Sequence, residues 1–207
     1  MIRILGRLSS INVRKVLWTC HEIGLDYERE DWGRGFRPTA SDEFMALNPH
    51  ALVPVLIDGP TVLWESNTIC RYLAASRGRD DLLPSAPAAR AEVEKWMDWQ
   101  ATGPGQSSSY AFHALSRRTP GYDDPARIGE SQANWTRHMT ILDAYLAGRG
   151  AFIAGDAFSL ADIVLGLMAQ RWFLTPFDKP RLERLHAYYS GLCARPAFVG
   201  HGGAGVP

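Results

Sequence analysis

The sequence predicts two domains, an α/β unit in the first third of the chain and an all-helical unit after it. Up to about residue 78, short runs of strand-forming residues alternate with helical patterns. Beyond residue 88 the apolar residues recur only at helical spacing. Residues 79–87 separate the two parts with two prolines and no periodicity, which is typical of a linker. We therefore expect domains at 1–78 and 88–207, joined by a linker at 79–87.

The first domain begins with a strand–helix–strand unit. Apolar residues alternate over Ile2–Leu5, as in a short strand. A helix is expected from Asn12 onward, and Gly24 is well placed to end it. The weak alternation over Tyr27–Asp31 fits a second strand, and the three elements together form a βαβ unit.

A short helix and a hairpin complete the first domain. The short helix is expected over Ser41–Leu47. The runs Val53–Ile57 and Thr61–Trp64 flank an Asp58-Gly59 pair, which is a strong hairpin signal. A helix that begins at Ser66 follows the second hairpin strand directly, and the Glu65-Ser66 pair is suited to cap it.

The second domain is expected to be a set of helices. The expected helices are Ala88–Gln100, Tyr110–Arg117, Ile128–Leu146, Leu160–Phe173 and Pro180–Cys193. Glycine, proline and serine at 102–109 predict an unusual break after the first of them. Residues from Pro196 to the end are expected to form a tail.

Composition excludes several classes of function. The 207 residues carry 22 basic and 22 acidic side chains without a basic patch, which argues against a nucleic-acid partner. The N-terminus has no apolar core of signal-peptide length, and the most apolar later run is too short to span a bilayer. The three cysteines show no metal-binding or CxxC spacing. We expect reduced thiols, no metal site, and a cytoplasmic protein that does not bind membranes.

The most informative stretch surrounds Val53-Pro54. A proline at the entrance of a strand is compatible with a cis bond and leaves the backbone groups of its neighbour free. The helix that starts at Ser66 follows the hairpin directly, and helix N-termini bind anions. Together these features predict a site for an extended peptide that carries a carboxylate.

Ser9, Ser10 and Asn12 lie where the first strand passes into the first helix. One interpretation is helix capping, because serine and asparagine satisfy the free amides of a first turn. The other requires a ligand with a thiol, whose thiolate would gain from the helix dipole and from hydroxyl or amide donors. A free thiol has a pKa of about 8.5, which falls to roughly 3.5–7.5 at such positions.

Three stretches resemble the cytosolic glutathione transferases. They are "NPHALVPVLIDG" with "LWESNTICRYL", "GRLSSINVRKVLWTCHEIGLDYE" and "FIAGDAFSLADIVLG". The second is similar to the bacterial serine-type branch, theta-like or beta-like. The resemblance implies a thioredoxin-like N-terminal domain (βαβ-α-ββα) and an all-helical C-terminal domain, in which Ser159 and Asp162 form a capping motif with a folding role.

The resemblance also implies roles for the residues of the first domain. In the family, a serine four residues before the basic residue of the first helix holds the glutathione sulfur. Here the basic residue is Arg14, so the resemblance assigns this role to Ser10. Asn12 shares the role, and Ser9 is the alternative to Ser10. Val53, before a cis Pro54, offers its backbone to the cysteinyl part of glutathione. Ser66 takes the γ-glutamyl carboxylate and Glu65 pairs with the ammonium.

The candidate partners of the glycine carboxylate of glutathione are His50 and the arginines Arg34 and Arg37. The activity implied is attack of the glutathione thiolate, as co-substrate, on a small hydrophobic electrophile, in a cytoplasmic homodimer. Two alternatives remain open: a glutathione-dependent peroxidase or disulfide reductase at the same site, or a binding module without turnover. The stretch Gly103–Ser109 departs from the family and leaves the second substrate undefined.

Overall fold

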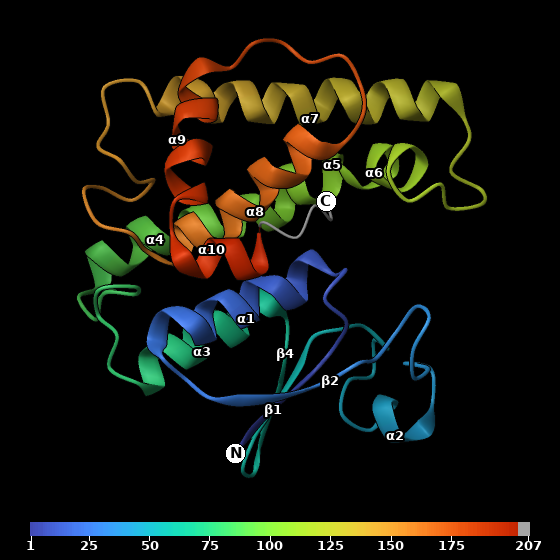
Figure 1. The fold of residues 1–207 in the computed structure, drawn as a ribbon, viewed down its shortest axis with the longest axis vertical. Helices are drawn as coiled ribbons and strands as arrows, with labels where there is room; N and C mark the ends of the chain where they lie inside the picture. The colour runs from blue at the N-terminus through green and yellow to red at the C-terminus, as the bar shows by residue number, and fades with distance from the viewer. Residues whose placement is uncertain (203–207) are drawn as a thin grey trace.

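A mixed four-stranded sheet forms the base of the molecule (Figure 1). The computed structural model describes residues 1–202. The strands are β1 (Ile2–Leu5), β2 (Tyr27–Glu30), β3 (Val55–Asp58) and β4 (Thr61–Trp64), in the order β2-β1-β3-β4. β1 pairs parallel with β2 and antiparallel with β3, and the expected hairpin joins β3 to β4 with Asp58 opposite Thr61.

Helices cover both faces of the sheet. α1 (Ile11–Ile23) and α3 (Ser66–Ser76) lie side by side between the sheet and the helical part of the molecule (Figure 1). The short helix α2 (Asp42–Met45) begins at Ser41, whose hydroxyl accepts a hydrogen bond from the Phe44 amide. Phe44 belongs to a small second core with Leu5, Trp32 and Val55. The strand–helix–strand start and the later hairpin confirm the predicted thioredoxin-like arrangement.

The remainder of the chain is helical. Its elements are α4 (Pro87–Thr102), α5 (Pro104–Ser107), α6 (Ser109–Leu115), α7 (Pro125–Tyr145), α8 (Leu160–Leu174), α9 (Glu183–Cys193) and α10 (Pro196–His201). No helix within residues 1–202 is both long and apolar enough to cross a membrane.

One expectation about these helices was confirmed only in part, and another was wrong. The predicted break at 102–109 shrinks to Gly103 (φ −94°, ψ −95°), because α5 and α6 continue the helical path on either side of Ser108. The predicted tail from Pro196 forms α10, because proline suits the first helical position and Phe198 is buried with its ring 5.0 Å from that of Trp18. The last part of that tail, residues 203–207, lies outside the described residues.

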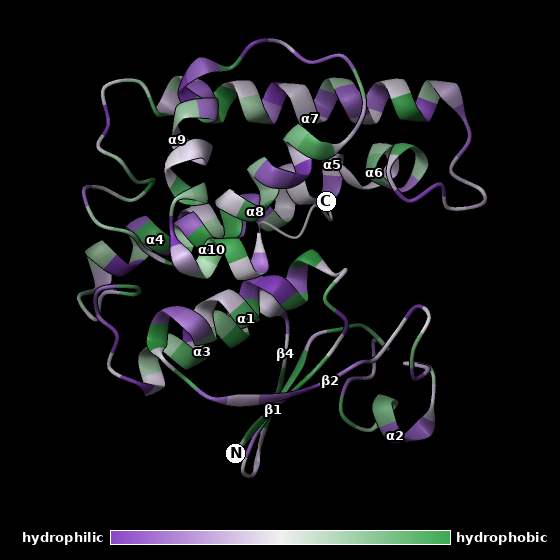
Figure 2. Ribbon diagram, viewed as in Figure 1, coloured by the Kyte–Doolittle hydropathy of each residue, from purple (hydrophilic) through white to green (hydrophobic). Residues whose placement is uncertain are grey.

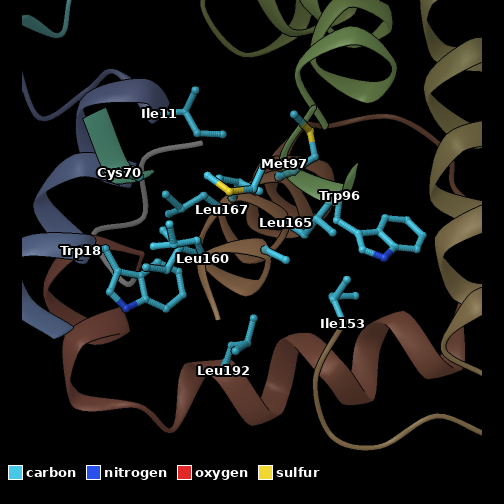
Figure 3. Packing of buried hydrophobic residues seen from close by; sticks show 14 of the residues in the cluster. Ile11, Trp18, Cys70, Trp96, Met97, Ile153, Leu160, Leu165, Leu167 and Leu192 are labelled. Carbon is cyan, nitrogen blue, oxygen red and sulfur yellow. The ribbon is translucent and has the colours of Figure 1, made fainter. Parts of the chain in front are cut away.

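Helix α8 is the centre of the helical part. Every residue from Leu160 to Trp172 is buried, as expected for a helix that is surrounded on all sides. Figure 3 shows α4, α9 and side chains of α1 gathered around it, whereas α7 on the outer edge alternates hydrophilic and hydrophobic stretches (Figure 2). The predicted capping box is present, and the buried Asp162 carboxylate accepts bonds from the Ile153 and Ser159 amides and the Tyr188 hydroxyl.

Candidate functional site

The turn between β1 and α1 is held close to the loop before β3. Gly6 has φ +154°, and a Cβ placed on it would lie 2.4 Å from Val13 Cγ2 and 3.1 Å from Val53 Cβ. Only glycine therefore lets the two segments approach this closely. The turn ends at Ser10, the N-cap of α1, whose backbone is extended (φ −95°, ψ 121°).

Ser10 is a helix-capping residue that does not use its side chain as a cap. Its hydroxyl makes no capping hydrogen bond, although the residue is only 8% exposed. Asn12, two residues further on, is exposed. A serine that leaves its hydroxyl free at a helix start has a donor available for a ligand, and the helix dipole favours an anion there.

The loop before β3 presents free backbone groups. The Val53–Pro54 peptide bond is cis, as the sequence suggested. Within residues 1–202 neither the amide nor the carbonyl of Val53 takes part in a hydrogen bond. The Asn48 side chain fixes the loop, since its amide donates to the Leu52 carbonyl (2.7 Å) and its oxygen accepts from the His50 amide (3.0 Å).

The start of α3 forms the other end of the site. Glu65 has a left-handed backbone (φ 70°), a conformation that non-glycine residues keep mainly at functional sites. Ser66 and Asn67 are buried. The Lys15 ammonium donates to Gln100 Oε1 (2.6 Å) and Asn67 Oδ1 (3.3 Å), and burial lowers the pKa of Lys15 to about 8.

Two cavities meet at the first turn of α1. The first, of about 510 Å³, contains Ser10 and Val53 in its wall, and the second, of about 380 Å³, contains Glu65, Ser66 and Lys15. Both are lined by Ile11, Asn12, Gly105 and Arg171. The cis-proline loop and the start of α3 thus lie in two adjoining cavities, here together called the groove, with Asn12 in the wall of both.

The packing around Gly105 gives a reason for one glycine in the stretch Gly103–Ser109, which departs from the family pattern. A Cβ on this residue would lie 2.6 Å from the Gln100 carbonyl oxygen, so a side chain is excluded. The kink at Gly103 and the missing side chain at Gly105 let α5 lie close against the last turn of α4. That packing places Gly105 in the wall of both cavities.

Four of the predicted site residues, Ser9, His50, Arg37 and Pro54, do not line either cavity. Ser9 is exposed, and its carbonyl accepts a hydrogen bond from Arg117 (3.0 Å). His50 is exposed with its ring 4.9 Å from that of Trp64. Arg37 pairs with Glu30 and Glu43 and stacks 3.8 Å above Trp32. Pro54 is buried behind the loop, whereas Arg34 does line the first cavity.

Four cationic or titratable side chains of the first cavity were missed at the sequence level. They are Arg7, His113, Arg117 and Arg171. They come from three separate segments, because His113 and Arg117 are four residues apart at the end of α6, so no local spacing connects the whole set. Arg171 alone carried a signal, because it is one of few polar residues in the otherwise apolar α8.

The cysteines lie apart from this groove. Burial raises the pKa of Cys20 to about 12 and that of Cys70 to about 11, so both are thiols rather than thiolates at neutral pH. Cys193 lies on α9, and none of the three lines either cavity. A nucleophilic sulfur in the groove must therefore come from a ligand.

The comparisons with known proteins agree with this architecture. The family model "Glutathione S-transferase, N-terminal domain" matches residues 2–75, and "Glutathione S-transferase, C-terminal domain" matches residues 117–191. Glutathione S-transferase GstB of Escherichia coli is 39% identical over 202 residues, 95% of each chain. Glutathione S-transferase 3 of Zea mays is 34% identical over 95% of this chain and 91% of its own.

A solved structure matches equally well. The theta class glutathione S-transferase of Xanthomonas axonopodis pv. citri, with glutathione bound, superimposes with a TM-score of 0.90 at 39% identity, over 97% of this chain and 96% of its own. Both family models, the near full-length relatives and the shared fold lead to one conclusion: the chain belongs to the glutathione S-transferase family.

Proposed function

We propose that this glutathione S-transferase binds glutathione along the groove, with its sulfur at the start of α1. The observation that carries the proposal is the adjoining pair of cavities, with Val53 in the wall of one, Ser66 in the wall of the other and Asn12 in the wall of both. In an extended glutathione the cysteinyl residue, with its backbone and its thiol, lies in the middle and the γ-glutamyl residue at one end. Val53 and Asn12 can therefore meet the cysteinyl residue while Ser66 meets the γ-glutamyl end.

Ser10 and Asn12 hold the sulfur in this proposal. The Ser10 hydroxyl is not used as a cap and donates to the thiolate, and the Asn12 side chain adds a second donor. Both stabilise the charged form and lower the thiol pKa, so the thiol proton passes to solvent when glutathione binds. The thiolate then attacks an electrophile held beside it, and proximity supplies much of the rate.

The γ-glutamyl end lies at the start of α3. The Ser66 amide and hydroxyl bind the α-carboxylate there, and the exposed Glu65 carboxylate pairs with the α-ammonium. The buried Lys15 ammonium adds positive charge beneath the carboxylate. The free amide and carbonyl of Val53 pair with the cysteinyl backbone.

Peroxidase or disulfide-reductase chemistry in this groove would depend on the glutathione sulfur, because Cys20 and Cys70 are buried with raised pKa values. Assays of aryl halide conjugation, organic peroxide reduction and mixed-disulfide reduction separate these activities. The homodimer and the cytoplasmic location stay predictions, and the elution volume in size-exclusion chromatography tests the first.

A crystal structure of the protein with glutathione tests the pose. We expect the sulfur within hydrogen-bond distance of Ser10 and Asn12, and the cysteinyl backbone paired with Val53. Ser66→Ala should raise the KM for glutathione, whereas Ser85→Ala, in the linker, should not. A sulfur turned away from Ser10 and Asn12, or a groove left empty by a protein that still conjugates aryl halides, would contradict the proposal.

A further inference from the structure

The first cavity has a strongly cationic wall. Arg7, Arg34, Arg117 and Arg171 line it together with His113, and no aspartate or glutamate of the described residues does. The second cavity differs, because Glu65 and Asp98 accompany its cations. The positive charge is therefore concentrated on the side of the groove that contains Ser10 and Val53.

Arg171 is the clearest sign that an anion belongs in this cavity. Its side chain lies in α8, is 8% exposed, and forms no ion pair or hydrogen bond with any residue in the range 1–202. It stacks 3.9 Å above the Phe112 ring, which satisfies none of its N–H donors. A buried guanidinium without an acceptor is costly, so such groups are normally paired.

The arginines also repel one another. Burial lowers the pKa of Arg171 well below its usual value, and the charges of Arg117 and Arg14 lower it further. Burial, with the charges of Arg7 and Arg34, lowers the pKa of Arg117. Residues 1–202 thus bring several positive charges together with no carboxylate in the cavity wall, and a bound anion would relieve that repulsion.

Two of these arginines, Arg117 and Arg171, reach the cavity from the helical domain. Arg117 follows α6, and its Nη2 donates to the Ser9 carbonyl (3.0 Å), which places its guanidinium beside the turn that carries Ser10. Arg117 and Arg171 lie 4.8 Å and 3.9 Å from the same Phe112 ring. Arg34 belongs to the other wall, in the loop after β2, and is available to the glycine carboxylate of glutathione.

We infer that the second substrate is an electrophile with an anionic group, of which a carboxylate is the simplest case. Arg117 and Arg171 bind this group, and Phe112 contacts the flat part of the molecule. The inference rests on the proposed function, since it assigns the second substrate of the same groove. For an aryl chloride, the thiolate forms the C–S bond, and chloride leaves with the electron pair of the C–Cl bond.

A pair of probes that differ in charge and little in size tests the inference. The probes are 4-chloro-3-nitrobenzoate and 4-chloro-3-nitrobenzamide, each assayed at saturating glutathione. Each kcat/KM is divided by the rate constant of the same probe with free glutathione, which removes the difference in intrinsic reactivity. A charge-assisted contact in place of a neutral one predicts a preference of roughly tenfold or more for the benzoate.

Substitutions locate the source of that preference. Arg117→Gln and Arg171→Gln should each reduce the preference about fivefold or more while the KM for glutathione changes little. Arg127→Gln is the matched control, because Arg127 stacks 4.2 Å above Tyr110 and lines neither cavity of the groove. It should leave the preference unchanged. Arg117 is only half-buried, so its variant tests the inference even where Arg171→Gln fails to fold.

Binding supplies a second readout that does not need turnover. Calorimetry of the glutathione-loaded protein should show tighter binding of 3-nitrobenzoate than of 3-nitrobenzamide. Equal corrected kcat/KM values and equal affinities for the charged and the neutral probes would overturn the inference and leave the proposed function intact. A rise in the KM for glutathione, with the probe preference kept, would assign the arginines to glutathione instead. Loss of glutathione binding in the unmodified protein would refute the proposed function itself.

Discussion

Substitution of Ser10 by alanine separates the role of a sulfur ligand from that of a helix cap. The Ser10 hydroxyl makes no capping hydrogen bond, so its loss should cost the fold less than the ~1 kcal/mol that a serine cap usually contributes. Ser41→Ala is the matched control, because the Ser41 hydroxyl does cap α2 and lines neither cavity. That variant should lose stability and keep its activity.

The effect of Ser10→Ala on the bound thiol follows from a single hydrogen bond. A charge-assisted hydrogen bond contributes about 1.5–3 kcal/mol, which corresponds to roughly one to two pKa units. The pKa of the bound thiol should therefore rise by that amount. It should stay below the value of free glutathione, because Asn12 and the dipole of α1 remain.

The pH profile of kcat/KM and the ultraviolet absorbance of the thiolate both measure this shift. Below the thiol pKa of the unmodified enzyme, kcat/KM should fall about 10- to 100-fold, and much of the loss should be recovered at high pH. A variant with an unshifted thiol pKa would refute the assignment of Ser10. A full shift in Ser9→Ala would transfer the role to Ser9.

Three further substitutions test other parts of the structure. Asp162→Ala leaves the four buried donors that bond to this carboxylate without an acceptor, so it should lower the free energy of unfolding by about 3–5 kcal/mol in chemical denaturation. A loss below about 1 kcal/mol would contradict the folding role of Asp162. Gly105→Ala places a methyl against the Gln100 carbonyl, so it should lower the free energy of unfolding by about 1–3 kcal/mol and remove much of the activity. Gly129→Ala, in open space on α7, should raise the free energy of unfolding by about 0.5–1 kcal/mol. Equal shifts of the melting temperature in the two variants would refute the steric argument. Burial, with nearby positive charge, lowers the pKa of His201 to about 4, so as pH falls from about 6.5 to about 4 the unfolded chain takes up a proton that the folded chain does not. Stability should fall over this window, and His201→Gln should remove that part of the slope in denaturation series; an unchanged slope would show that other groups cause it.

Much of the first domain was predictable because its signals are local. An Asp-Gly turn, a glycine at a helix end and alternating apolar residues each act over a few positions. The elements β1, α1 and β4 were found at or within one residue of their predicted bounds, whereas β3 begins two residues later than predicted. The break after α4 was overestimated for a related reason. Glycine and proline signal a change of direction, but the packing that lets α5 resume the helix involves Gln100, which the pattern does not reveal.

The cationic cavity was out of reach for the opposite reason. More than a hundred residues separate Arg7 from Arg117, and more than fifty separate Arg117 from Arg171. Arg7 and Arg117 resemble ordinary surface arginines by their neighbours in the sequence, and only Arg171 stands out in an apolar helix. Only the docking of α6 and α8 against the turn after β1 brings them together. His50 and Arg37 failed to reach the groove because Trp64 and two glutamates, respectively, offer them nearer partners.

The residues by which α1 joins both domains have an engineering consequence. Arg14 donates to Gln170 of α8 (2.7 Å), Lys15 to Gln100 of α4 (2.6 Å), and the Trp18 ring meets that of Phe198. A hybrid enzyme spliced at the linker would separate these donors and rings from the partners they evolved with. Chimeras of related transferases should therefore retain α1 together with the helical half of the same parent, even though that places the crossover inside the first domain.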